Sequence, residues 1–100
     1  MGTELPNTSK TTVWKIGKIT DSMKELLTEK NKRYGDSALN PTRVFNKLNA
    51  TESILIRLDD KLGRVKNNDS LRRNDIIDLT GYLILLMASK DWLEFKDLID

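Results

Sequence analysis

Apolar residues recur at three- and four-residue intervals along most of the chain, the spacing that places side chains on one face of an α-helix. The first run predicts an amphipathic helix from about residue 12 to about residue 33. Its apolar face consists of Val13, Ile16, Ile19, Met23, Leu26 and Leu27. Gly17 lies inside this helix, where glycine costs up to about 1 kcal/mol relative to alanine, so we expect another element to pack closely there.

The same spacing of apolar residues predicts two more long helices. One begins near Thr51 and presents on one side Ile54, Leu55, Leu58, Leu62 and Val65. After a polar loop over residues 66–70, residues 74–87 predict a helix that is apolar nearly all round, with Asn74 as its N-cap.

Two short helices complete the prediction. Asn40 before Pro41 is typical of a helix start and predicts a helix over residues 41–48 that buries Val44, Phe45 and Leu48. Asp91 is expected to cap a final helix whose inward face consists of Trp92, Phe95, Leu98 and Ile99. No segment shows sustained strand-like alternation. The pattern therefore predicts an all-α fold, a small helical bundle of three main helices plus two short helices.

Length and composition are those of one small domain: 100 residues, 38% of them hydrophobic, with a net charge of +2. We expect residues 1–11 to form a flexible N-terminal tail and residues 12–100 a single helical domain. Small domains often gain stability by association, so a homo-oligomer is expected. A basic cluster over residues 30–33, with Arg43 and Lys47, has few aromatic residues beside it, so nucleic acid is not the expected partner.

The sequence contains no cysteine and no histidine, which excludes disulfides, thiol nucleophiles and imidazole catalysis. Catalysis would need carboxylates, lysine, tyrosine or a divalent ion held by carboxylates. No signal peptide is recognisable, and the apolar run falls short of the ~20 residues that span a bilayer. A cytoplasmic protein without a membrane partner is therefore expected.

Opposite charges occur on the two sequential helices at helical spacing. Arg57, Lys61 and Arg64 form a basic stripe, and Asp75, Asp78 and Tyr82 form an acidic and aromatic stripe. A carboxylate on so apolar a helix needs a cation or water. The two stripes predict one polar cleft for a phosphorylated ligand. The structural alternative is that Asp75 lies in the first turn of its helix and stabilises the positive end of the helix dipole. The basic stripe would then be a solvated face.

The turn over residues 34–37 is a third candidate site. Tyr34, Gly35 and Ser37 combine an aromatic ring, a glycine that lets backbone approach a ligand, and a small hydroxyl. Most turns of this kind only end helices.

Taken together, segments 30–37, 58–64 and 75–82 resemble the phage and bacterial nucleotide-modification-associated helical domain family. The shared elements, over roughly residues 25–98, are a K-x-x-x-Y-G-x-S turn, a K-L-x-R helix and a D-x-x-D-x-x-x-Y helix. The resemblance implies an all-α protein linked to nucleotides and phage biology. By position, it implies ligand-binding roles for Tyr34, Gly35, Ser37, Lys61, Arg64, Asp75, Asp78 and Tyr82.

The leading expectation is a phage protein that sequesters a nucleotide or cyclic oligonucleotide immune signal in the infected bacterial cell. Such an anti-defence sponge needs neither catalysis nor a cofactor. The first alternative is a magnesium-dependent enzyme similar to the all-α nucleoside-triphosphate pyrophosphatases. Asp75 and Asp78 would supply half of its metal site. The family pattern needs a second pair of carboxylates at i, i+3 on the preceding helix, whereas Asp59 and Asp60 are adjacent. The second is a structural or partner-binding helical protein whose interface contains Trp14, Met23 or Trp92.

Overall fold

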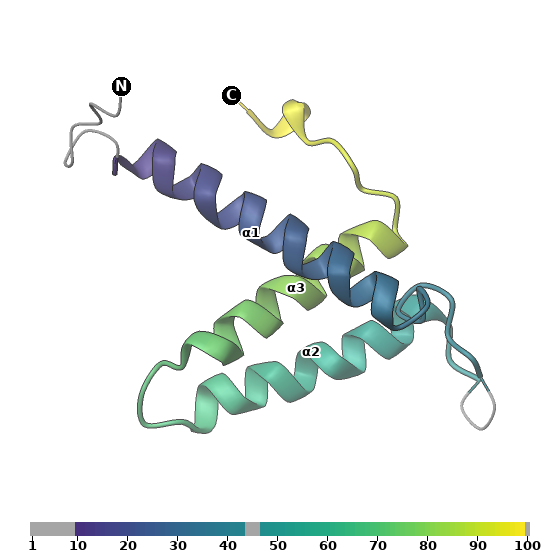
Figure 1. Cartoon of the computed structure of the whole chain (residues 1–100). Helices are drawn as coiled ribbons and strands as arrows, with labels where there is room; N and C mark the ends of the chain where they lie inside the picture. The colour runs from purple at the N-terminus through teal and green to yellow at the C-terminus, as the bar shows by residue number, and fades with distance from the viewer. Residues whose placement is uncertain (1–9, 44–46, 100) are drawn as a thin grey trace.

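The computed structural model describes residues 10–43 and 47–99, which form three long α-helices and one short turn (Figure 1). The helices are α1 (Thr12–Arg33), α2 (Ala50–Asn67) and α3 (Arg73–Ser89), followed by the 3-10 turn η1 (Lys96–Leu98). No strand occurs within these ranges. The predicted all-α bundle of three main helices is therefore confirmed.

Side chains at the helix ends explain where α1 and α2 begin. The hydroxyl of Thr11 accepts a hydrogen bond from the Trp14 amide at 3.2 Å. At α2, the Asn49 side chain accepts from the Glu52 amide at 2.8 Å, and the Glu52 carboxylate accepts in return from the Asn49 amide at 3.4 Å. Such a reciprocal box satisfies two amides that have no partner inside the helix. After α1 the chain turns at Gly35, whose φ of 62° is the left-handed conformation expected there.

Helices α2 and α3 form an antiparallel hairpin that is fastened at both ends. Ile54 and Leu58 are its buried apolar side chains on α2. At the open end, the hydroxyls of Thr51 and Ser89 lie 2.9 Å apart in a hydrogen bond. At the loop end, the Asn68 side chain donates to the Asp75 carboxylate at 2.8 Å. These contacts fix the register of the two helices.

Helix α1 crosses α3 and contacts the hairpin through its second half (Figure 1). Met23 is buried there, and Gly81 of α3 lies opposite it. A Cβ on Gly81 would stand 3.2 Å from Leu27 Cδ2 and 3.7 Å from Met23 Cε, so the missing side chain is what lets α1 approach. The first half of α1 extends beyond the hairpin with its apolar residues exposed. None of the described helices is long and apolar enough to cross a bilayer.

The predicted short helix over residues 41–48 is wrong in its described residues, and the predicted final helix is reduced to η1. Residues 41–43 and 47–49 are not helical, and Val44 and Phe45 lie outside the described residues. At the other end, Asp91 does not cap a helix, because its φ is 57° and residues 92–95 between it and η1 have no regular secondary structure. Trp92, Phe95, Leu98 and Ile99 are exposed rather than inward.

Two predictions about local packing are also wrong. Nothing lies within 4 Å of a Cβ built on Gly17, so the close approach expected there occurs instead at Gly81. Helix α3 starts at Arg73, and its N-cap is Arg72, two residues before the predicted N-cap Asn74, with no side-chain cap. Most of the predicted tail, residues 1–9, lies outside the described residues.

Candidate ligand-binding cleft

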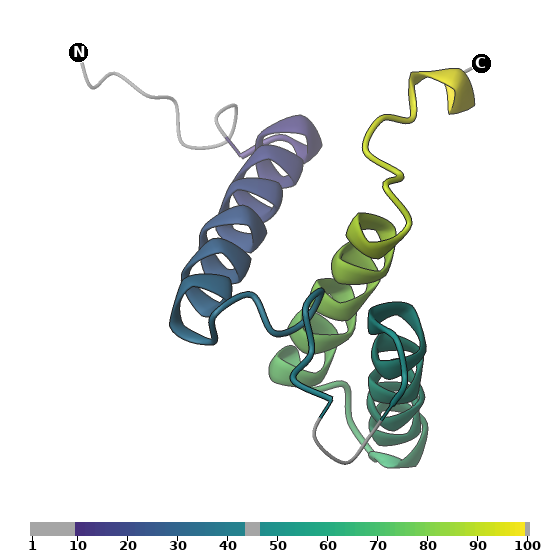
Figure 2. The same ribbon diagram turned by 90° about the vertical axis from the view of Figure 1, so that its right-hand side faces the viewer.

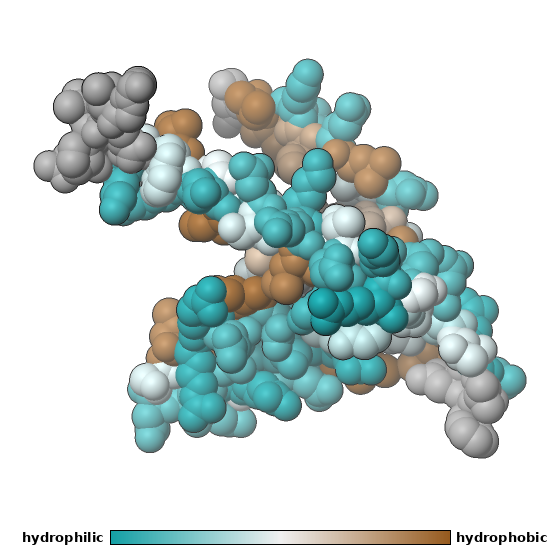
Figure 3. All heavy atoms as spheres, viewed as in Figure 1, coloured by the Kyte–Doolittle hydropathy of each residue, from teal (hydrophilic) through white to brown (hydrophobic). Residues whose placement is uncertain are grey.

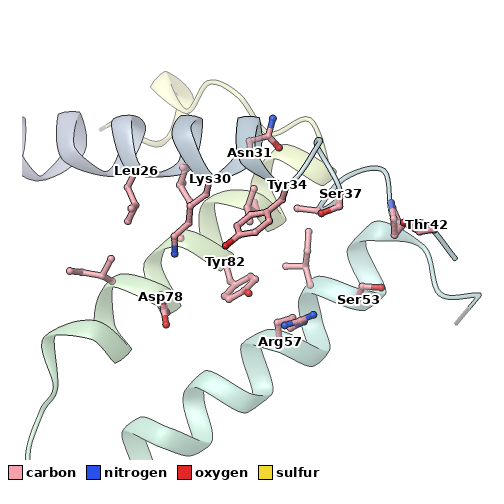
Figure 4. Close-up of a pocket in the computed structure, with 17 residues that line it drawn as sticks. Leu26, Lys30, Asn31, Tyr34, Ser37, Thr42, Ser53, Arg57, Asp78 and Tyr82 are labelled. Carbon is pink, nitrogen blue, oxygen red and sulfur yellow. The ribbon is translucent and has the colours of Figure 1, made fainter. Parts of the chain in front are cut away.

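A cleft of about 630 Å³ lies where α1 crosses the hairpin (Figure 4). It exists because α1 packs against α3 but not against α2 within the described chain. The space between α1 and α2 is thus open, and α3 forms its floor. Its volume falls in the ~300–1,000 Å³ range of small-molecule sites.

Each helix contributes side chains one helical turn apart, the spacing that places two residues on the same face. Helix α1 and the residue after it supply Lys30 and Tyr34. Helix α2 supplies Ser53 and Arg57, and α3 supplies Asp78 and Tyr82. Figure 4 shows the side chains of Lys30 and Tyr34 reaching from α1 toward the side of the cleft formed by α3. Polar groups from three helices therefore converge on one space.

The apolar part of the cleft is continuous with the small core. Ile54 is buried beneath it, and the other aliphatic lining residues are Leu26, Leu27, Ile77 and Leu85. Two tyrosine rings, Tyr34 and Tyr82, add flat aromatic surface. A ligand with a planar ring therefore has apolar and aromatic surface to contact.

The charges of the cleft are not balanced. Asp78 already has a partner, since its carboxylate lies 3.3 Å from the ammonium group of Lys61. The same ammonium lies 6.0 Å from the centre of the Tyr82 ring, within the range of a cation–π contact. Lys30 and Arg57 line the cleft without an ion pair to any described residue. The cleft therefore offers two free cations beside one neutralised carboxylate.

The structure brings together much of the site predicted from the sequence. Tyr34, Ser37, Arg57, Asp78 and Tyr82 line the cleft, and Lys61 contacts two of them. The basic stripe of α2 and the acidic stripe of α3 meet as expected, through Lys61 and Asp78.

Three predicted residues lie elsewhere. Arg64 is exposed and does not line the cleft, because it is two turns farther along α2 than Arg57. Asp75 is buried at the start of α3, where Asn68 donates to it, as in the structural alternative. Gly35 shapes the turn after α1 through its positive φ but does not line the cleft.

Sequence reasoning placed Lys30 only in a basic cluster and did not single out Asn31 or Ser53. All three line the cleft. A signal for Lys30 was present, because it lies one turn before Tyr34 in the same motif. Nothing in the sequence indicated that this face of α1 would cross above Arg57.

The carboxylates do not form a metal cage in the described part of the chain, where no three acidic residues are grouped closely enough to hold an ion. Asp75 is turned to the loop between α2 and α3, and Asp59 and Asp60 are exposed on α2. The donor set that the pyrophosphatase alternative requires is thus not assembled.

No protein-family model, curated protein or solved structure matches this chain. The resemblance to the nucleotide-modification-associated family therefore stays a prediction, and the function must be argued from the cleft.

Proposed function

We propose that the cleft binds a nucleotide, or a cyclic oligonucleotide, and retains it without chemical change. The observation that carries the proposal is a pair of cations, Lys30 and Arg57, on opposite walls of a cleft that also holds two tyrosines. Neither cation forms an ion pair with a described residue. Guanidinium and ammonium groups suit phosphate oxygens, while aromatic rings suit a base.

The polar residues give each part of such a ligand a partner. The amide of Asn31 and the hydroxyls of Ser37 and Ser53 can donate to or accept from ribose and base edges. Asp78, held by Lys61, adds an acceptor in a fixed position. Binding without chemical change needs no cysteine or histidine. It needs only that these polar groups be held in place by rigid helices. For this binding we propose a biological role. The protein would be encoded by a phage and would sequester an immune signal inside the infected bacterial cell.

The test uses a panel of cyclic dinucleotides, cyclic trinucleotides, cyclic ADP-ribose isomers and deoxynucleoside triphosphates, each incubated with the protein and magnesium. Depletion of one nucleotide from solution, with intact recovery after heating, is the expected result. A converted product would instead support the pyrophosphatase alternative. No depletion of any member would overturn the proposal.

Variants then locate the site. Lys30→Ala and Arg57→Ala should each weaken binding by about tenfold or more, as expected for loss of a charge-assisted contact of ~1.5–3 kcal/mol. Arg64→Ala is the matched control, because Arg64 lies on the same helix outside the cleft. If Arg64→Ala weakens binding as much as Arg57→Ala, the ligand does not occupy this cleft.

A further inference from the structure

Two apolar segments project from the hairpin without partners in the described structure. The α1 arm, residues 10–20, exposes Val13, Ile16 and Ile19 by 79%, 56% and 61%. The C-terminal arm, residues 91–99, exposes five large apolar side chains: Trp92, Leu93, Phe95, Leu98 and Ile99. Figure 3 shows hydrophobic atoms at the surface along both arms.

The chain exposes more area than a compact monomer of this mass does on average. The chain exposes 8639 Å², whereas a compact monomer of 11.5 kDa exposes about 5,800 Å². The difference, roughly 2,800 Å², exceeds the ~800 Å² that each partner buries in a standard protein interface. The radius of gyration, 16.9 Å, is likewise above the ~13 Å expected for 100 residues. A second copy packed on the two arms can bury part of this difference.

The two arms carry opposite charge. The α1 arm contains Lys10, Lys15 and Lys18 and no acidic residue. The C-terminal arm contains Asp91, Glu94 and Asp97 against one lysine, Lys96. Two α1 arms would repel each other, as would two C-terminal arms, whereas one arm of each kind attracts the other.

Within one chain the arms extend from the hairpin without touching (Figure 2). The direction of the C-terminal arm is set by hydrogen bonds at the end of α3, where the Trp92 amide donates to Met87 O at 3.0 Å and the Asp91 amide to Ala88 O at 3.1 Å. The two arms extend to the same side of the hairpin (Figures 1 and 2), carry opposite charge and have no contact with each other, and we propose that the protein forms a two-fold dimer in which each C-terminal arm packs on the α1 arm of a second copy. A two-fold axis forms both contacts at once and covers all four arms.

Charge reversal tests this arrangement with the full chain in sedimentation experiments over micromolar concentrations. The wild-type protein is expected to be a dimer. Lys15→Glu with Lys18→Glu should weaken dimerisation at least about tenfold, and so should Glu94→Lys with Asp97→Lys. The first pair is compatible with α1, because glutamate and lysine have similar helix propensities. Asp59→Lys with Asp60→Lys is the matched control, since both residues are exposed on α2 outside the arms.

Mixing the two arm variants decides which copy supplies each arm. Either variant alone pairs arms of like charge, but a heterodimer of the two has opposite charges at both contacts. Restored dimerisation on mixing is therefore the expected result. A monomeric wild type, a dimer as sensitive to the α2 control as to the arm reversals, or two variants that stay monomeric when mixed would each overturn the proposal. Circular dichroism of each variant checks that the helices remain formed.

Discussion

The α2–α3 hairpin and helix α1 are both amphipathic helical segments, but their apolar faces are buried to different extents. The hairpin has buried apolar residues, a capping box and a hydrogen bond at each end. Helix α1 is longer but is anchored to the hairpin through its second half alone. The difference shows that an apolar stripe defines a helix without determining how much of that stripe is covered within one chain.

The same difference separates the two proposed surfaces. Where α1 meets α3, its apolar face closes one side of a cleft with free cations. Where α1 extends beyond the hairpin, the face continues with its apolar side chains exposed. An isolated helix is marginally stable in water, so the uncovered half has a physical need for a further partner.

The largest expected effect is a cavity in the hairpin. Leu58→Ala removes a side chain that is 6% exposed and should lower the free energy of unfolding by about 2–4 kcal/mol. Leu62→Ala, one turn along the same helix and 52% exposed, should cost under about 1 kcal/mol. Urea denaturation at a fixed protein concentration measures both. Equal losses would mean that α2 buries a different face.

The next effect concerns the seam between the two regions. In Gly81→Leu the new Cβ would lie 3.2 Å from Leu27 Cδ2. Overpacking of this kind lowers the free energy of unfolding by about 1–3 kcal/mol. Hydrogen exchange should then increase along α1 more than along α2. Gly17→Leu is the control, with nothing within 4 Å of its Cβ. It is expected to be neutral or to stabilise α1 by up to about 1 kcal/mol. Unchanged exchange in Gly81→Leu would show that α1 is not held at this glycine.

The smallest effect is the ion pair beside the cleft. A double-mutant cycle of Lys61→Met and Asp78→Asn should give a coupling free energy near the upper end of the ~0.2–1 kcal/mol range of exposed pairs, because the two side chains are 17% and 35% exposed. The matched cycle of Arg33→Met and Glu29→Gln, whose side chains are 71% and 54% exposed, should give less. A larger coupling for the second pair would contradict the partial burial of Asp78.

Much of the local structure was predictable because it depends on short-range chemistry. The spacing of apolar residues defined α1, α2 and α3, and Gly35 marked the end of α1. The short helices failed for the opposite reason. Asn40-Pro41 and Asp91 are good local start signals, but a segment of a few residues becomes helical only when packing stabilises it. The described residues of the first segment are not helical, and the second segment forms only η1.

The candidate site divides in the same way. The charged stripes of α2 and α3 could be paired from the sequence, because two sequential helices with a short loop lie antiparallel, and Lys61 meets Asp78 accordingly. The sequence raised the separate roles of Asp75 and Asp78 only as an alternative, since both residues lie on one face of α3. Their depth along the hairpin decides which one makes the loop contact and which one the cleft contact.

The sequence by itself determined the number of long helices, the chemical types available to a site and the opposite charges of the two ends. Only the tertiary structure decided that α1 crosses α3 at Gly81, which opens a cleft lined by Lys30 and Arg57 and leaves the first half of α1 uncovered. The physical reason is that helix periodicity is a local property of the chain. The point where two helices touch depends instead on the sizes of side chains far apart in sequence, here a missing Cβ on α3 opposite Met23 and Leu27 of α1.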